Sequence, residues 1–134
     1  MVRLITNKPN KTTSEFNPPR ITVIVTGHTN CGGVAAALEI ASGHNEFPGT
    51  PLSDWLQPLA NLAKAEGLPS LPPEEALKIL RVLNVKQQVD NLSQSEVIEE
   101  AWKHGKNVEI HGWLYTLETG LLEDLCITRT GPSV

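Results

Sequence analysis

The chain has 134 residues, of which 40% are apolar and 19% are charged, and its formal net charge is −4. This size and composition predict one soluble globular domain over residues 1–134. The lack of a basic stripe excludes a typical nucleic-acid-binding protein, and no apolar run reaches the roughly 18 residues that a membrane span needs.

Residues 1–20 are expected to form an N-terminal arm ahead of a core over residues 21–134. Val2–Thr6 suits a short strand, whereas the polar, proline-containing stretch 7–19 is typical of a loop. No apolar segment follows the basic residues at the start, so no signal peptide is expected. Two cysteines make no disulfide framework. Together these observations favour a cytoplasmic protein whose thiols are free.

A β-branched, apolar run at Ile21–Thr26 is typical of a strand buried on both faces. A glycine-containing loop follows it, and a helix is predicted from Gly32 or Gly33 to Ser42. Open α/β folds place their ligands where a strand leads through such a loop into a helix. We therefore expect the functional site in the loop after Thr26.

Further helices are predicted in the middle of the chain. Apolar residues at three-to-four spacing predict a helix over Pro51–Ala65, in which Pro58 is expected to cause a kink or a break. Two prolines followed by two glutamates start the next helix, which runs to about Leu92. Ser93–Glu96 fits a capping box for a last helix, which Gly105 ends.

The C-terminal region is predicted to be a β-hairpin. Asn107–Leu117 alternates as a strand, and Leu121–Thr128 returns antiparallel to it after a turn. The whole order predicts an α/β fold: a small, mainly parallel β-sheet flanked by helices, with a C-terminal antiparallel hairpin. So small a sheet is expected to leave an open edge beside its central strand, which favours a homodimer or a higher oligomer.

Two side chains in the loop after the central strand are good zinc ligands. His28 and Cys31 are separated by two residues, and imidazole and thiolate are both common zinc donors. The start of the helix beside Cys31 favours the thiolate. Gly32 and Gly33 let the backbone approach an ion or a small anion, so they are predicted to form a substrate- or anion-binding loop. Zinc held here would activate water at neutral pH.

The spacing alone leaves other interpretations open. Two donors are fewer than the three or four that zinc takes, and a cysteine such as Cys31 is often an inert core residue. Cys126 is expected to pack within its strand. His44 and His104 have no ligand spacing, and neither has His111, although the sheet would be able to bring His111 near the loop.

Two other chemistries of a strand–loop–helix are disfavoured. A cysteine phosphatase loop needs an arginine six residues after the cysteine, where this chain has Ala37. A nucleotide phosphate loop ends in Gly-Lys-Ser/Thr, whereas here Gly33 is followed by Val34.

Three stretches of the chain resemble the β-class carbonic anhydrases. Gly27–Gly33 is similar to the second zinc-ligand motif of that family, Asn84–Leu92 to the helix that follows, and His111–Tyr115 with Thr119–Leu122 to the late strand and hairpin. The stretches occur in the family's order. The resemblance implies a zinc enzyme that reversibly hydrates carbon dioxide to bicarbonate through zinc-bound water.

The resemblance covers the C-terminal part of that family. It implies that His28 and Cys31 are two of the three protein ligands, Cys, His and Cys. The family's first cysteine lies in an earlier Cys-x-Asp-x-Arg segment, whose Asp and Arg form a dyad that controls the fourth position on the metal. No cysteine precedes Cys31 here, and residues 1–20 contain no aspartate. The chain therefore resembles a truncated form with a replacement N-terminal segment.

The missing segment leaves two hypotheses for function. In the first, the chain is a carbonic anhydrase of low activity, and the third ligand comes from a partner chain or is water. In the second, the chain is a catalytically degenerate paralogue that acts as a structural or interaction subunit. Zinc binding and its loss on substitution of His28 or Cys31 distinguish the two.

Overall fold

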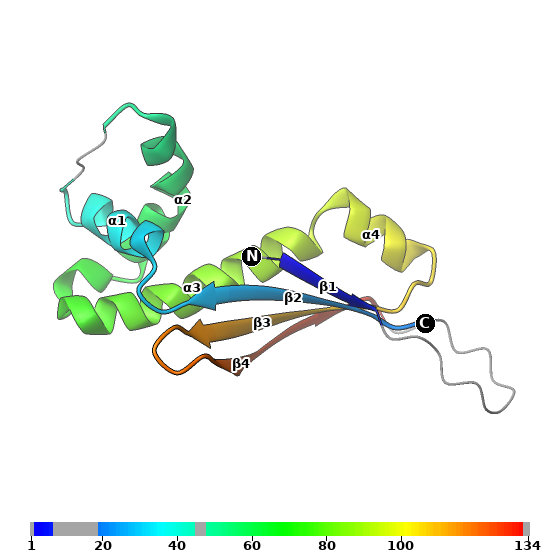
Figure 1. Ribbon diagram of the computed structural model, residues 1–134. Coiled ribbons are helices and arrows are strands. Elements are labelled where there is room, and N and C mark those ends of the chain that lie inside the picture. Colours follow the sequence, from blue (N-terminus) through cyan, green and yellow to red (C-terminus); the bar gives the residue numbers. More distant parts are fainter. Residues whose placement is uncertain (1, 7–18, 45–47, 133–134) are drawn as a thin grey trace, which may run out of the picture.

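A computed structural model describes residues 2–6, 19–44 and 48–132 as one sheet with helices beside it (Figure 1). The elements in chain order are β1 (Val2–Thr6), β2 (Ile21–His28), α1 (Gly32–Ala41), α2 (Pro51–Ala65), the 3-10 turn η1 (Leu68–Ser70), α3 (Pro73–Ser93), α4 (Glu96–Lys103), β3 (Val108–Thr116) and β4 (Leu121–Thr130). This order confirms the predicted α/β class. Among the described helices, none combines the length and the apolar character needed to cross a bilayer.

The sheet has the strand order β1-β2-β3-β4. Strands β2 and β3 pair in parallel, from Ile21 opposite Val108 to His28 opposite Tyr115, and β3 and β4 form the predicted antiparallel hairpin. The sheet is more mixed than predicted, because β1 also pairs antiparallel with β2. A parallel partner needs a long crossover connection, whereas strands that pair antiparallel do not.

The predicted open edge beside the central strand is wrong. Strand β1 occupies that edge, with Val2 opposite Val25 and Thr6 opposite Ile21. The described part of the N-terminal arm, Val2–Thr6, thus joins the sheet. The prediction of an oligomer that forms through an unpaired edge of β2 therefore has no support over Ile21–Val25, where β1 already pairs with that edge.

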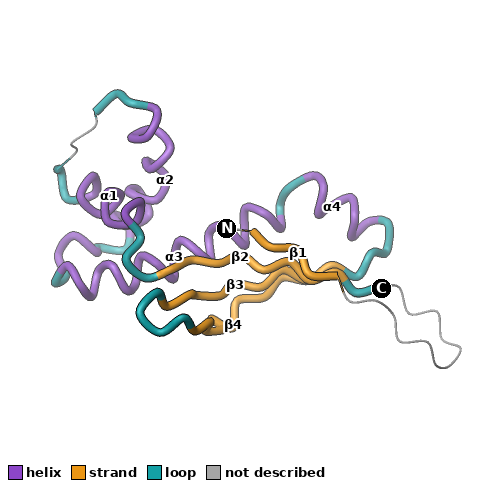
Figure 2. Tube along the Cα trace, in the orientation of Figure 1, coloured by secondary structure: helices purple, strands orange, loops and turns teal. Residues whose placement is uncertain are grey.

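Helix α3 runs from beside α1 and α2 to beside the sheet (Figure 2). Its two halves belong to two separate hydrophobic cores. Its first half packs with α1, α2 and η1 in what we call the helical core. Its second half packs on β2 and β3, together with α4, in what we call the sheet core. Members of the helical core include Val34, Ala37, Leu56, Ala60 and Leu80, and members of the sheet core include Val23, Val25, Val85, Val89 and Ile110.

Helix α2 has the predicted bounds, but it is continuous through Pro58, so the predicted break is wrong. Proline leaves the carbonyl four residues earlier, that of Asp54, without its helical partner. Both Pro58 and Asp54 are exposed, so water can satisfy this carbonyl. The buried face of α2, with Leu56 and Ala60, meanwhile keeps the two halves packed on one core.

The predicted capping box at the start of α4 is also wrong. Ser95 is the N-cap of α4, but its hydroxyl donates to the carbonyl of Leu92 at 2.7 Å and makes no cap hydrogen bond. The hydroxyl of Ser93 donates to the carbonyl of Asp90 at 2.8 Å. Because the link between the helices is so short, both serines reach the last carbonyls of α3 and satisfy those instead.

The alternation of β3 is confirmed, whereas the predicted packing of Cys126 is wrong. Val108 and Ile110 are buried on the side of α3. Cys126 is exposed and has a φ of +57°, at a shift of register opposite Gly112 and Trp113. The shift leaves two residues of β4, Leu125 and Cys126, without a partner on β3 and disturbs the alternation as a β-bulge does. Nothing in the local sequence, such as a glycine at that position, marks it.

The helices that pack on the sheet within the described residues are α3 and α4, and both contribute to the sheet core. We call the opposite face the uncovered face only because no described helix packs on it, since Ile24 on this face is itself 5% exposed. It carries the side chains that alternate with the sheet core. On β2 and β3 these are Thr22, Ile24, Thr26, His28, Glu109, His111, Trp113 and Tyr115. The indole Nε1 of Trp113 is buried and has no hydrogen-bond partner within the described part of the chain.

An ion pair at the start of β2 predicts a pH dependence of stability. The guanidinium of Arg20 contacts the Glu109 carboxylate and lowers the pKa of Glu109, with a smaller contribution from His111. A depressed pKa stabilises the fold above the usual carboxylate range, and this contribution is lost as the pH falls through the folded-state pKa. We expect Arg20→Ala to lower the free energy of unfolding at neutral pH by up to about 1 kcal/mol, because the arginine is exposed.

Urea unfolding of wild type and Arg20→Ala at pH 7 and at about pH 3 tests this expectation, and the two should converge in acid. Lys78→Ala, which removes an exposed charge on α3, serves as the control. A difference between wild type and Arg20→Ala that stays constant across both pH values would contradict the assignment.

Candidate metal centre

His28 is the last residue of β2, and its exposed imidazole lies opposite Tyr115 of β3. Its Nδ1 is 2.8 Å from the backbone carbonyl oxygen of Thr29. Because a carbonyl oxygen only accepts, Nδ1 must carry the proton in this contact, which leaves the lone pair of a neutral ring on Nε2. This is how a metal-binding histidine is usually oriented, with its second nitrogen held by the protein.

Cys31 is the N-cap residue of α1, and its half-buried side chain packs against the helical core. Its side chain makes no capping hydrogen bond. His28 therefore belongs to the end of the sheet and Cys31 to the start of a helix. Only two residues separate them. The two donors can act on one ion only if this short segment keeps the end of the strand and the start of the helix in a fixed relative position.

The turn between β3 and β4 holds this loop. The Glu118 carboxylate accepts hydrogen bonds from the Thr29 hydroxyl at 2.7 Å and from the Asn30 amide at 2.6 Å. The Thr29 hydrogen bond is the main cause that lowers the pKa of Glu118, followed by the backbone N–H of Glu118 itself, with smaller contributions from Asn30 and from the charge of Arg81. The sequence placed Glu118 only in a turn, so this contact was missed.

Gly32 and Gly33, the predicted anion-binding loop, form the first turn of α1. Nothing lies within 4 Å of the position that a Cβ on Gly32 would take, so its backbone is open to a ligand. A Cβ on Gly33 would lie 3.8 Å from Leu56 and 4.0 Å from the Cys31 sulfur, which is ordinary contact. The anion-binding role of both residues stays a prediction.

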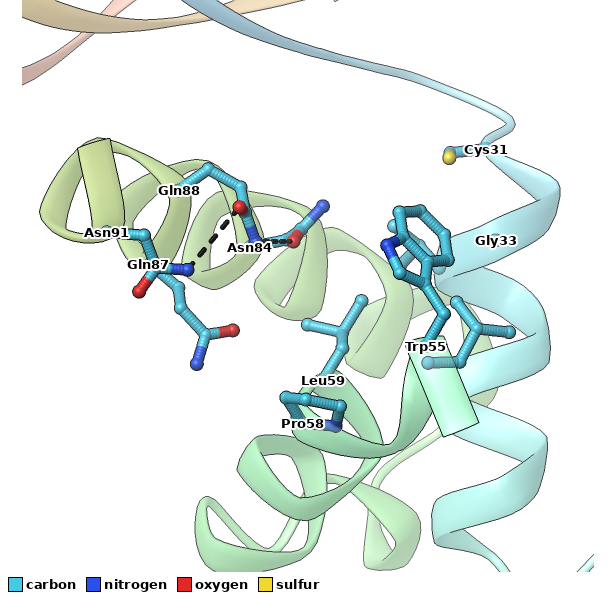
Figure 3. A pocket seen from close by; sticks show the side chains of 11 residues that line it. Cys31, Gly33, Trp55, Pro58, Leu59, Asn84, Gln87, Gln88 and Asn91 are labelled. Carbon is cyan, nitrogen blue, oxygen red and sulfur yellow. Dashed lines mark hydrogen bonds between the residues drawn. The ribbon is translucent and has the colours of Figure 1, made fainter. Parts of the chain in front are cut away.

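Two hollows meet at Cys31. The first, of about 270 Å³, has Trp55 and Leu59 of α2 on one side and polar amides of α3 on the other (Figure 3). The amides belong to Asn84, Gln87, Gln88 and Asn91. The second, of about 300 Å³, is lined by Asn30, Gly32 and Arg81, among others. Arg81 brings a cation to the wall that Cys31 also lines, a placement that helical periodicity alone did not reveal.

The remaining histidines lie apart from this pair. His44 is exposed after α1, and His104 is exposed at the end of α4, where its Nδ1 is 2.7 Å from the Glu100 carbonyl. His111 lies on the uncovered face, 3.4 Å from the Glu109 carboxylate and 3.0 Å from the Thr128 hydroxyl. No group of three His, Cys, Asp or Glu side chains within the described ranges is arranged to hold a metal ion.

Comparisons with known proteins identify the family of this chain. Residues 20–122 match the family model described as carbonic anhydrase. The fold superposes on a Coccomyxa β-carbonic anhydrase, solved in complex with acetazolamide, with a TM-score of 0.71 and 29% identity. The chain belongs to the β-carbonic anhydrase family. The superposition covers 82% of this chain and 49% of the Coccomyxa chain.

Other β-carbonic anhydrases and curated carbonic anhydrases match over the same extent. The β-carbonic anhydrase CafA of Aspergillus fumigatus is 36% identical with a TM-score of 0.65, covering 79% of this chain and 49% of its own. The carbonic anhydrase of Emericella nidulans is 29% identical over 117 residues, and that of Candida albicans 33% identical over 112 residues. These stretches cover 81% and 80% of this chain but 46% and 37% of the relatives. The chain thus spans about half or less of the β-carbonic anhydrases it matches.

The donors present fit zinc in kind but not in number. A neutral imidazole with a free Nε2 and a thiol at a helix start are both zinc ligands. A catalytic zinc site uses three protein donors, and the described residues bring no third His, Cys, Asp or Glu to this pair. Zinc therefore fits His28 and Cys31 as part of a site.

Proposed function

We propose that the chain binds zinc through His28 and Cys31 and catalyses the reversible hydration of carbon dioxide to bicarbonate once a third donor completes the site. The observation that carries this proposal is the pairing of a histidine whose Nε2 is left free with a half-buried thiol three residues later. Zinc, when bound, acts as a Lewis acid and makes water a nucleophile at neutral pH.

The chain's own residues have separate roles in this proposal. His28 and Cys31 hold the ion. The backbone of Gly32 and Gly33 at the start of α1, which is open at Gly32, would bind the bicarbonate anion together with the Arg81 guanidinium, which lines the same hollow as Gly32 and Cys31. The apolar side of the first hollow, formed by Trp55 and Leu59, would receive the uncharged carbon dioxide.

We propose that a second copy of the chain supplies the third donor. By strand register His28 lies on the uncovered face of the sheet, so a chain that packs on this face would approach the imidazole. Trp113, whose buried indole N–H lacks a partner within the described residues, and the exposed Leu122 belong to the same face. The chain is similar in structure to a β-carbonic anhydrase from Sordaria macrospora, one of two that are described as tetrameric. We also propose that the chain forms a homodimer or a higher oligomer. We propose that it is located in the cytoplasm, where both cysteines would stay free thiols.

A non-catalytic role is the second candidate. It is favoured by the shortage of donors around His28 and Cys31 within the described residues. In that case the chain keeps the fold and acts as a structural or interaction subunit.

Zinc content measured on the purified, zinc-reconstituted chain tests these alternatives. We expect zinc in the wild type at between one ion per two chains and one per chain, and its loss in His28→Ala and in Cys31→Ser, because each variant removes a donor. Lys78→Ala is the control, since it removes an exposed side chain of α3 that is not a zinc donor and should retain zinc. Hydration of carbon dioxide and the mass of the assembly in solution are measured on the same samples.

Each outcome decides between the two functions. Zinc and hydration that are lost together in both donor variants support the enzyme. A wild type that takes up no zinc contradicts it and leaves the structural subunit.

A further inference from the structure

The segment between the two proposed ligands consists of Thr29 and Asn30, and one carboxylate holds both. Glu118 Oε2 accepts from Thr29 Oγ1 at 2.7 Å, and Glu118 Oε1 accepts from Asn30 Nδ2 at 2.6 Å. Hydrogen bonds to an ionised carboxylate are among the stronger ones in proteins. A single side chain of the β3–β4 turn therefore fixes every residue between His28 and Cys31.

Backbone contacts complete this attachment. The Thr29 N–H donates to the Tyr115 carbonyl at 3.0 Å, and the Leu117 N–H donates to Thr29 Oγ1 at 2.9 Å. Asn30 has a φ of +54°, in the left-handed region that residues other than glycine rarely adopt. Such a conformation persists where the surrounding structure holds it, and the Asn30 side chain is itself held by Glu118.

We propose that Glu118 is a positioning residue, which orders the Thr29–Asn30 segment so that His28 and Cys31 are presented together to a metal ion. Glu118 forms no metal-binding group with these two side chains, so it acts through the segment between them. The metal-binding part of this inference rests on the proposed function. The ordering of the loop does not, because it concerns the metal-free chain.

The first test is amide hydrogen exchange in the metal-free protein, measured residue by residue. We expect Glu118→Ala to speed exchange of the Thr29 and Leu117 amides about tenfold or more, because both hydrogen bonds depend on an ordered Thr29. Amides of the sheet core, such as that of Ile110, should keep their protection, which separates local loosening from global unfolding. Glu123→Ala removes another exposed carboxylate from the same hairpin and should change neither amide.

A second variant separates hydrogen bonding from charge. The side chain of Glu118→Gln has nearly the same shape, and its carbonyl can accept from the Thr29 hydroxyl. Its amide can donate to Asn30 once the Asn30 amide turns over, so both hydrogen bonds are kept. We expect Glu118→Gln to restore most of the exchange protection that Glu118→Ala loses.

The third test is the affinity for Co²⁺, whose absorption reports binding to histidine and cysteine. We expect Glu118→Ala to raise the dissociation constant about tenfold, as do changes in residues that orient metal ligands, while Glu118→Gln and Glu123→Ala stay close to wild type. Unchanged exchange at Thr29 and Leu117 in Glu118→Ala overturns the inference, and so does faster exchange with unchanged Co²⁺ affinity. If the wild type binds no Co²⁺, the proposed function fails, and the exchange data alone decide whether Glu118 orders the loop.

Discussion

Replacing Leu80 by alanine is expected to lower the free energy of unfolding by about 2–5 kcal/mol, the range measured for buried leucines in protein cores. Leu80 is 0% exposed and is among the largest fully buried side chains of the described residues. It lies on the half of α3 that packs against α1 and α2. The alanine would leave a cavity where three helices meet, and close-packed neighbours relax only partly into such a space.

Urea unfolding followed by circular dichroism measures this loss. Val82→Ala on the same helix is the control, because Val82 is 36% exposed and alanine is the better helix former. Its effect should stay within about 1 kcal/mol. A loss below about 1 kcal/mol for Leu80→Ala would contradict the close packing of the helical core.

The second large effect is expected at Gly27, the residue before His28. A Cβ on Gly27 would lie 2.6 Å from Cγ2 of Val85, a residue that is 2% exposed in the sheet core. Its next neighbour, Cδ1 of Leu114, would be 3.5 Å away. Overpacking against one buried methyl group is expected to cost about 1–3 kcal/mol in Gly27→Ala.

A double-mutant cycle shows whether this one contact is the cause. Val85→Ala removes the methyl group in the way, so the double variant Gly27→Ala/Val85→Ala should be more stable than the sum of the single losses predicts, by about 0.5–3 kcal/mol. Gly32→Ala, on the other side of His28, is the matched control, because nothing lies within 4 Å of its Cβ position. Strict additivity of Gly27→Ala and Val85→Ala would show that Val85 is not the obstacle.

Features that follow from local periodicity were predictable from the sequence. The bounds of α2 agree with the spacing of its leucines and alanines, and the alternation of β3 agrees with its buried and half-buried residues. The position of His28 and Cys31 between a strand and a helix follows from the apolar run and the glycines around them. In each case the signal and the structure involve residues a few positions apart.

Features that depend on tertiary contacts were not predictable. Glu118 meets Thr29 across 89 positions of sequence, and neither residue has a pattern that points to the other. The direction of β1 depends on its partner, and the outward turn of Cys126 depends on a register shift against β3. Pro58 shows the opposite case, in which a strong local signal for a break is overridden by the packing of the helix around it.

The division into two cores has a consequence for how the loop responds to binding. The strand that ends at His28 belongs to the sheet core, whereas Cys31 packs against the helical core. A molecule that both side chains hold can bind only when both cores are folded and docked. By mass action, the bound molecule would suppress local unfolding of the helical core and of the sheet core. Occupancy of the loop would then appear as slower hydrogen exchange in both halves of α3, since one half belongs to each core.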